Sequence, residues 1–345
     1  MKYFYCVIAL TAAVLLVVSP AAASEAVRGS VADCLETVVP SLFAFTVLAI
    51  YLQYSGLYKT ALRPITKPLS MLLRMDEELC AVFVLSNVGG YPVGVKLLSE
   101  LVREGRLSRE DAGRMLCCCF GSGPAFVVGI VGIGVFGSAR AGLALFGICF
   151  ATSLLMAAAV RIRGEITLDG KADKRYDFTA NCFVSSVISG AKVMFTVCVM
   201  IVGFSVIASL LRTLGVYSAA EILFKNEAIF PALLEVTRIK SAAAISYAFP
   251  LCAALLSFGG VCVLMQISAL SNGIPLKGLM ISRAAAVIVS ALLAMPFSRI
   301  FSVTDEAVFA PNVTIIPFTG NAVLSLCVLA MCAILLGGDI LARKR

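Results

Sequence analysis

Long apolar runs alternate with short basic segments along this chain, and two of the runs are interrupted by a Gly-Gly pair. Residues 241–276 form 36 consecutive uncharged positions. A single helix of that length would extend about 54 Å, whereas the hydrocarbon core of a bilayer is about 30 Å thick. The run must therefore break, and Gly259-Gly260 is the expected place. The run 79–95 is interrupted in the same way at Gly89-Gly90.

The other apolar runs predict membrane-spanning helices. They cover residues 37–58, 115–139, 141–160, 193–211, 278–297 and 321–341. Hydrophobic residues make up 60% of the chain and charged residues 14%, against about 25% charged residues in soluble domains. The predicted fold class is all-α: a polytopic helical membrane protein with two similar halves. Each half is expected to contain a broken, re-entrant helix at its Gly-Gly pair.

The first 24 residues predict either an N-terminal transmembrane helix or a signal peptide. Lys2 precedes an uncharged apolar run, and Ala21-Ala22-Ala23-Ser24 is typical of a signal-peptidase site. Both alternatives place residues 25–36 outside the cytoplasm.

Basic residues predict the topology of the first half and of the segment that follows it. Positive charge gathers in 59–74, in 96–114 and in 161–178, and cytoplasmic loops carry an excess of Lys and Arg. A re-entrant segment 79–95 keeps all three on the cytoplasmic side, whereas a full crossing would place 161–178 outside. We therefore expect re-entrance, with 161–178 as a cytoplasmic linker between the halves 25–160 and 179–342.

The two halves share short matching pieces in the same order. Residues 55–58 match 214–217, and residues 79–81 match 251–253. In each half a Gly-Gly pair follows, and then a Glu-Gly or Asn-Gly turn. An internal repeat is predicted. A strict inversion would place the basic tail 343–345 outside, against the charge rule, so the side of the C-terminus stays open.

Broken helices in a membrane predict a binding site, because unwound backbone is tolerated only where it faces protein or a water-filled cavity. Flanking helix N-termini favour anions. The alternative is a glycine-rich packing kink. A third break is predicted at 121–124. We expect the two Gly-Gly breaks to approach each other. The candidate substrate-binding residues are Asn87, Gly89, Gly90, Tyr91, Pro92, Ser122, Gly123, Pro124, Ser257, Gly259, Gly260 and Gln266.

Glu235 is an acidic residue beside apolar segments, and such a residue indicates a functional site. It is a candidate for binding a coupling cation or proton, together with Thr237. The alternative is an ion pair with Arg238 or Lys240. Lys192 lies between two apolar runs, where extension of its side chain to the interface is expected.

Several function classes are disfavoured by what the sequence lacks. The chain has no His and 13 Cys. The Cys residues lie mostly in apolar runs and form no C-x-x-C pair, so neither a metal site nor a Cys-His or Ser-His catalytic set is expected. We predict no enzyme activity and no cofactor. No basic run is long enough to indicate a nucleic-acid partner, and the expected partner is the lipid bilayer.

At its breaks the chain resembles the sporulation integral membrane protein YlbJ family. The resemblance extends over about residues 35–300. It rests on Gly90-Tyr91-Pro92-Val93-Gly94-Val95-Lys96, Ser122-Gly123-Pro124, Leu234-Glu235-Val236-Thr237, Ser257-Phe258-Gly259-Gly260 and Gln266.

The resemblance implies two nucleoside-recognition Gate repeats, distantly like concentrative nucleoside transporters. It also implies a place in the outer forespore membrane, transport of dipicolinic acid and a role in spore cortex formation. The expected substrate is a small anion. A non-transporting assembly protein of sporulation and a nucleoside or cation carrier are the alternatives. A homo-oligomer is left open.

Overall fold

A computed structural model of the chain describes residues 2–168, 180–224, 229–239 and 247–301, and within these ranges every regular element is a helix. The all-α prediction is confirmed. The predicted span 321–341, the basic tail 343–345 and positions 169–178 of the predicted linker lie outside the described residues. Among those described, five helical stretches are long and apolar enough to cross a membrane. They are Pro20–Ser55, Ala139–Ile162, Ala180–Thr213, Ala248–Leu270 and Lys277–Phe297.

The second helical stretch begins earlier than the apolar pattern indicates. After α1 (Lys2–Val18), α2 (Pro20–Asp33) continues through a π-helical turn into α3 (Val39–Ser55). Pro40 explains the turn. A proline has no N–H, and its ring clashes with the preceding helical turn. The backbone widens to a π-helix over Cys34–Val38 and does not end there, so residues 25–36 are part of the helix.

The first Gly-Gly pair separates two helices that fold back on each other. After α4 (Tyr58–Ala61) and α5 (Arg63–Leu73), α6 (Glu77–Gly89) and α7 (Tyr91–Arg103) pack side by side. Two hydrogen bonds of 2.6 and 2.5 Å from the guanidinium of Arg106 to the carboxylate of Glu78 join the two open ends of this pair. The N-terminal end of α6 and the C-terminal end of α7 therefore lie next to each other.

The run 115–139 is divided into short pieces. Helix α8 (Arg109–Leu116) is capped by Ser108, whose hydroxyl accepts a 3.0 Å hydrogen bond from the backbone N–H of Asp111. Residues 117–123 are not helical. The π-helix η2 (Ala125–Ile133) and α9 (Gly134–Phe136) follow.

The remaining helices lie in the second part of the chain, apart from α10 in the first. Their bounds are α10 (Ala139–Ile162), α11 (Ala180–Thr213), α12 (Val216–Phe224), α13 (Ile229–Leu234), α14 (Ala248–Phe258), α15 (Gly260–Leu270), α16 (Lys277–Ala294) and the 3₁₀ turn η4 (Met295–Phe297). Helix α10 has almost the predicted bounds. Helix α11 is 34 residues long, since no Gly-Gly pair or Pro interrupts it, and Lys192 is exposed on it.

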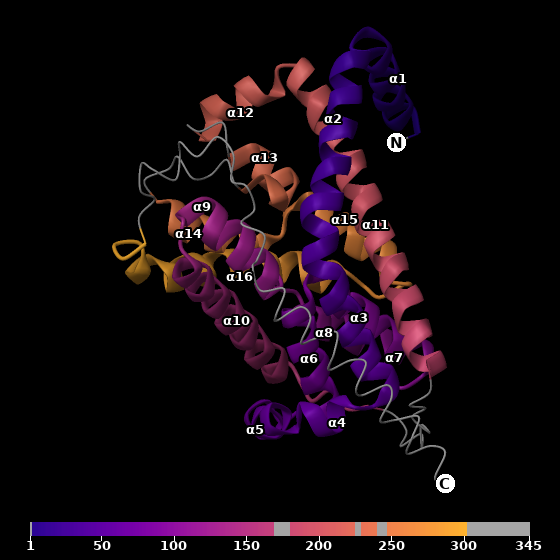
Figure 1. Cartoon of the computed structure of the whole chain (residues 1–345), viewed down its shortest axis with the longest axis vertical. Coiled ribbons are helices and arrows are strands. Elements are labelled where there is room, and N and C mark those ends of the chain that lie inside the picture. Colours follow the sequence, from indigo (N-terminus) through magenta and orange to yellow (C-terminus); the bar gives the residue numbers. More distant parts are fainter. Residues whose placement is uncertain (1, 169–179, 225–228, 240–246, 302–345) are drawn as a thin grey trace.

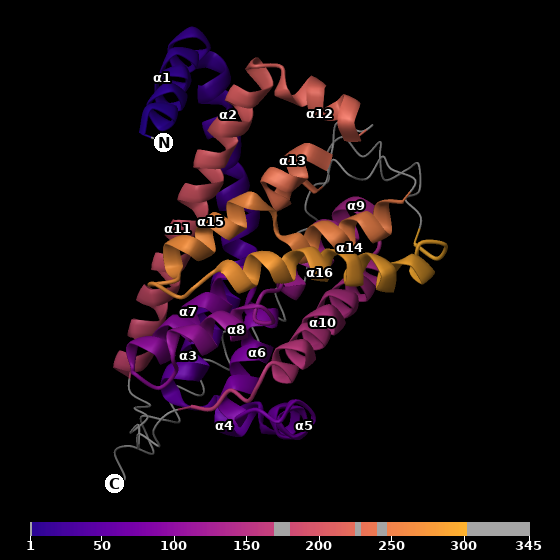
Figure 2. The same cartoon turned by 180° about the vertical axis from the view of Figure 1, so that it is seen from behind.

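The helices form a bundle with α12 and α1 at one end and α4 and α5 at the other (Figures 1 and 2). Helix α11 runs alongside α2 and its continuation α3, and α10 packs against η2 and α16. The pair at the second Gly-Gly break is arranged differently from α6 and α7. Helix α14 packs mainly against α16, whereas α15 packs against α11 and α7. The likeness of the two halves stays a prediction.

The basic segments of the first half meet at one end of the bundle. Arg114, at the end of α8, donates a 2.6 Å hydrogen bond to the carbonyl of Gly164, and Arg161 donates one of 3.0 Å to the carbonyl of Leu72. The backbone N–H of Leu168 donates to Asp76 at 2.9 Å. The loop before α6, helix α8 and the start of the predicted linker are thus held together.

Candidate functional site

The first break is fixed by glycine. Gly90 has φ +95° and ψ 174°, a backbone conformation that residues with a Cβ rarely adopt. Helix α6 ends one residue earlier, and α7 begins one residue later with Pro92 in its first turn. A proline suits this place because the first turn of a helix leaves its N–H groups unpaired anyway.

The third break lies directly against the first. A Cβ added to Gly123 would lie 2.8 Å from the carbonyl oxygen of Val88 and 3.4 Å from the backbone nitrogen of Gly90. A Cβ on Gly94 would overlap the carbonyl oxygen of Cys119. The non-helical backbone of 117–123 therefore crosses α6 and α7 at their break, and glycines permit the contact.

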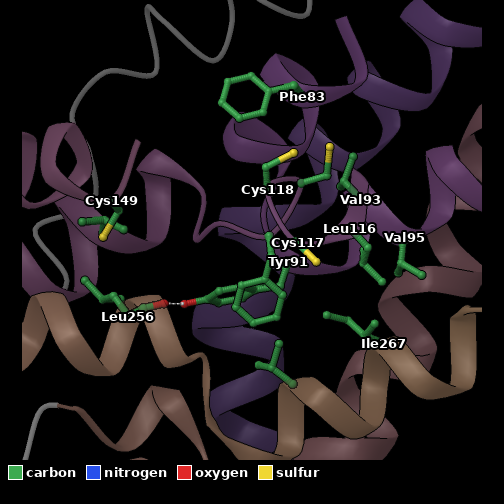
Figure 3. Packing of buried hydrophobic residues seen from close by; sticks show 14 of the residues in the cluster. Phe83, Tyr91, Val93, Val95, Leu116, Cys117, Cys118, Cys149, Leu256 and Ile267 are labelled. Carbon is green, nitrogen blue, oxygen red and sulfur yellow. Dashed lines mark hydrogen bonds between the residues drawn. The ribbon is translucent and has the colours of Figure 1, made fainter. Parts of the chain in front are cut away.

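The second break reaches the same place from the other part of the chain. Helix α14 ends at Phe258, and Gly259 and Gly260 both have positive φ, +82° and +84°. A Cβ on Gly259 would lie 2.6 Å from the ring of Phe120. The hydroxyl of Tyr91 donates a 2.6 Å hydrogen bond to the carbonyl of Leu256 (Figure 3). All three breaks therefore meet.

A cavity of about 40 Å³ lies at this meeting point. Eight of the predicted site residues line it: Gly90, Tyr91, Pro92, Ser122, Gly123, Glu235, Thr237 and Gln266. Val38 in the π-helical turn, Val236, and apolar side chains of α3, η2, α11 and α15 complete the lining. We refer to this space as the central cavity.

The other predicted site residues support the breaks from outside the central cavity. The side-chain amide of Asn87 donates a 2.8 Å hydrogen bond to the carbonyl of Phe83 and lies against Gly121. Gly260 is close to the backbone of Leu233 and Val236. Ser257 lines a second cavity, described below. Gly89, Pro124 and Gly259 are not among the lining residues of the central cavity either.

Glu235 is the acidic group of the central cavity. It is only 6% exposed, and its carboxylate accepts hydrogen bonds from the backbone N–H of Thr237, at 2.9 Å, and from the Thr237 hydroxyl. Arg238 is 3.9 Å away and its side chain is 46% exposed. The ion-pair alternative is thus present as a long contact at the edge of the bundle, while the carboxylate itself faces the interior.

Lys96, the last residue of the segment Gly90–Lys96, has a structural role in α7. Lys96 pairs with Glu100 at 2.5 Å, one helical turn further along α7, and Arg103 pairs with the same carboxylate at 2.7 Å. Lys96 does not line the central cavity. It neutralises a buried carboxylate on α7.

Arg283 is a residue of the site that sequence reasoning missed. It lies on α16, is 4% exposed, and its guanidinium lies 4.3 Å from the centre of the Phe120 ring. It donates to the carbonyl of Ser257, at 3.2 Å, and to that of Cys117, at 2.5 Å. The available signal was a single charge inside the apolar run 278–297, which by itself indicates a functional position.

Two further cavities adjoin these groups. A small one of about 10 Å³ is lined by Arg283, Phe120, Ser122 and Ser257, among others. A larger one of about 490 Å³ lies between α2, α11 and α13 and is lined by both acidic and basic side chains, including Arg212 and Arg238. We call these the arginine cavity and the outer cavity. In the described part of the chain no cluster of three His, Cys, Asp or Glu side chains could hold a metal ion.

Comparison with known proteins gives one informative relative. No model of a known protein family matches the chain, and no solved structure matches it. The sporulation integral membrane protein YlbJ of Bacillus subtilis (strain 168) is 29% identical over 149 residues, which cover 42% of this chain and 36% of the relative. The match therefore spans about a third of the relative's length. It confirms the predicted resemblance and supports a YlbJ-like family assignment for this integral membrane protein.

Proposed function

We propose that this protein is a sporulation membrane protein that carries a small organic anion, dipicolinic acid, across the outer forespore membrane for formation of the spore cortex. The observation that carries the proposal is a cavity with a buried carboxylate, lined by the first and third breaks, with the second break packed against them. Backbone breaks and buried ionisable groups are costly in a membrane and mark transport sites. The resemblance to YlbJ supports the sporulation role.

Helix N-termini at the central cavity support an anionic substrate. Gly90, Tyr91 and Pro92 form the start of the 13-residue helix α7, and Ser122 and Gly123 precede η2. The positive end of the α7 dipole at this point favours negative charge. Gln266 and Ser122 add side chains that can donate hydrogen bonds to a carboxylate.

Glu235 serves a coupling proton or cation in this scheme. A carboxylate repels a dicarboxylate substrate, so it is unsuited to direct contact with the ionised form. Its hydrogen bonds to Thr237 hold it at the cavity wall. Binding of a proton or cation there would remove the repulsion before the substrate enters.

The central cavity is closed to organic molecules in this conformation. Its volume of about 40 Å³ is enough for a few water molecules, whereas sites for small organic ligands usually measure about 300–1,000 Å³. The outer cavity, at about 490 Å³, reaches that range. Because Arg238 lines the outer cavity and also contacts Glu235, we propose that the outer cavity forms part of the substrate's path when the breaks separate.

The first broken pair supports a re-entrant arrangement. Helices α6 and α7 pack against each other, and the Glu78–Arg106 pair joins their ends. The basic segments before and after this pair lie at one end of the bundle. We propose that this end is cytoplasmic and that each half is a Gate-like repeat.

A carrier for a nucleoside or a cation is the second candidate. Glu235 and Gln266 both line the central cavity, and a carboxylate with an amide is suited to neutral hydroxyl-bearing or positively charged ligands. A non-transporting assembly protein is the third, and it requires no flux at all. None of these functions is enzymatic.

Flux into vesicles separates these candidates. Purified protein is reconstituted into liposomes, and uptake of dipicolinate and of uridine is compared with uptake into protein-free liposomes. The proposal predicts dipicolinate uptake above the protein-free level and no uridine uptake. Uridine uptake without dipicolinate uptake would establish the second candidate, and the absence of both would favour an assembly role.

A further inference from the structure

The arginine cavity contains two buried polar atoms that make no hydrogen bond within the described part of the chain. They are Nε of Arg283 and Oγ of Ser122, and both residues line this cavity. Ser122 also lines the central cavity, so the third break forms the wall between the two. Buried polar atoms are nearly always satisfied by protein, water or a bound ion, and the two residues that carry these atoms line the same small cavity.

The charge of Arg283 is balanced only by neutral groups. Its two terminal nitrogens donate to the carbonyls of Cys117 and Ser257, which lie at the C-terminal ends of α8 and α14. Carbonyls at helix ends carry a partial negative charge. Across the described residues no carboxylate forms an ion pair with this guanidinium. A buried cation without a countercharge is strongly disfavoured, most of all in a membrane.

We propose that the arginine cavity binds a single negatively charged atom, either a halide ion or one carboxylate oxygen, between Nε of Arg283 and Oγ of Ser122. The volume of about 10 Å³ is close to that of one water-sized occupant. Ser153 and Ser257 add hydroxyls to the lining. No acidic side chain lines the cavity, so nothing there would offset the repulsion between a cation and the Arg283 guanidinium.

This site does not depend on the proposed transport function. A fixed halide would complete the charge of Arg283 and hold α8, α14 and α16 together. A carboxylate oxygen of a carried anion would use the same donors only while the substrate is bound. Binding of free halide therefore tests the site itself, and competition by dipicolinate tests which source occupies it.

The experiment is a halide titration of the purified full-length protein in detergent. The midpoint of thermal unfolding is followed as bromide replaces gluconate at constant ionic strength, since a ligand that binds only the folded state raises this midpoint. We expect a saturable rise for the wild type. Arg283→Gln should weaken the apparent bromide affinity about tenfold or more, because a charge-assisted hydrogen bond is lost. Arg140→Gln, an exposed arginine on α10, is the matched control and should leave the titration unchanged.

A second variant keeps the proposal testable if Arg283→Gln does not fold. Ser122→Ala retains the guanidinium and removes one donor, so bromide affinity should fall while the protein stays folded. Bromide-soaked crystals should show an anomalous peak beside Nε of Arg283. Identical titrations for wild type and Ser122→Ala, or a water molecule in place of the peak, would overturn the proposal.

Addition of dipicolinate to the same titration identifies the occupant. Competition with bromide assigns the site to a substrate carboxylate, and undisturbed bromide binding assigns it to a halide. Failure of vesicle transport would leave the bromide result intact, so the two proposals fail separately.

Discussion

The hydroxyl of Tyr91 donates a 2.6 Å hydrogen bond to the carbonyl of Leu256, 165 residues further along the chain. Tyr91 begins α7, immediately after the first break, and Leu256 lies in the last turn of α14, before the second. Carbonyls in the last turn of a helix have no partner within the helix. One side chain from the first break thus satisfies a carbonyl at the second, and any separation of the breaks must disrupt this bond.

Replacement of Tyr91 by Phe should destabilise the closed bundle. The substitution leaves the carbonyl of Leu256 without its donor, at a cost of about 1–3 kcal/mol, so the midpoint of thermal unfolding in detergent should fall. Tyr54→Phe is the control, because the Tyr54 hydroxyl is 3.4 Å from Oγ of Ser189, a weak contact. Equal midpoints for the two variants would show that the bond does not stabilise the fold.

Replacement of Gly94 by Ala should disrupt the contact between α7 and the third break. The added methyl group would overlap the carbonyl oxygen of Cys119, and overpacking of this kind costs about 1–3 kcal/mol. Gly147→Ala in α10 is the matched control, since its Cβ would meet nothing within 4 Å. We expect Gly94→Ala to lower the unfolding midpoint and Gly147→Ala to keep or raise it. The opposite order would refute the close approach.

Replacement of Glu235 by Gln should impair transport more than expression. Gln keeps the shape and a hydrogen bond to Thr237 but cannot bind a proton or cation by charge, and loss of one charge-assisted contact corresponds to about a tenfold effect. Dipicolinate uptake into vesicles is the readout, normalised to the amount of folded protein. Glu110→Gln, an exposed residue on α8, should behave as wild type. Full uptake by Glu235→Gln would remove Glu235 from the mechanism.

Side-specific labelling should place both ends of the α6–α7 pair on one side of the membrane. Single cysteines at the exposed positions Glu77, at the start of α6, and Glu110, after the end of α7, on a background without native cysteines, are expected to react only from the cytoplasmic side. A cysteine at Glu221, on α12 at the opposite end of the bundle, should react only from outside. Labelling of Glu77 and Glu110 from different sides would exclude re-entrance.

The sequence predicts where the helices of this site break better than it predicts which side chains face the central cavity. Gly-Gly pairs and the Ser108 cap act locally, so the positions of the breaks and the start of α8 could be read from the pattern. The pattern does not indicate which residues of the breaks face the central cavity. On a helix, neighbouring positions differ by about 100°, and this difference directs Asn87 toward Gly121 and away from the central cavity.

Tertiary contacts explain why the sequence analysis did not identify Arg283 as a residue of the site. Arg283 interacts with the carbonyls of Cys117 and Ser257, which are distant from it in sequence, and neither residue type indicates a partner for arginine. The continuous helix Pro20–Ser55 was also missed, because the predicted run began after the charged residue Glu36, whereas the helix continues through the charged positions 25–36 and the π-helical turn.

Substrate protection of Ser122 tests the central claim most directly. Ser122→Cys on a background without native cysteines is reconstituted in vesicles, and the rate of its alkylation is measured with and without dipicolinate, with Glu110→Cys as the exposed control. If the breaks open onto a substrate site, Ser122→Cys reacts slowly, dipicolinate slows it further, and Glu110→Cys is unaffected. An alkylation rate at Ser122→Cys that dipicolinate does not change would contradict the account.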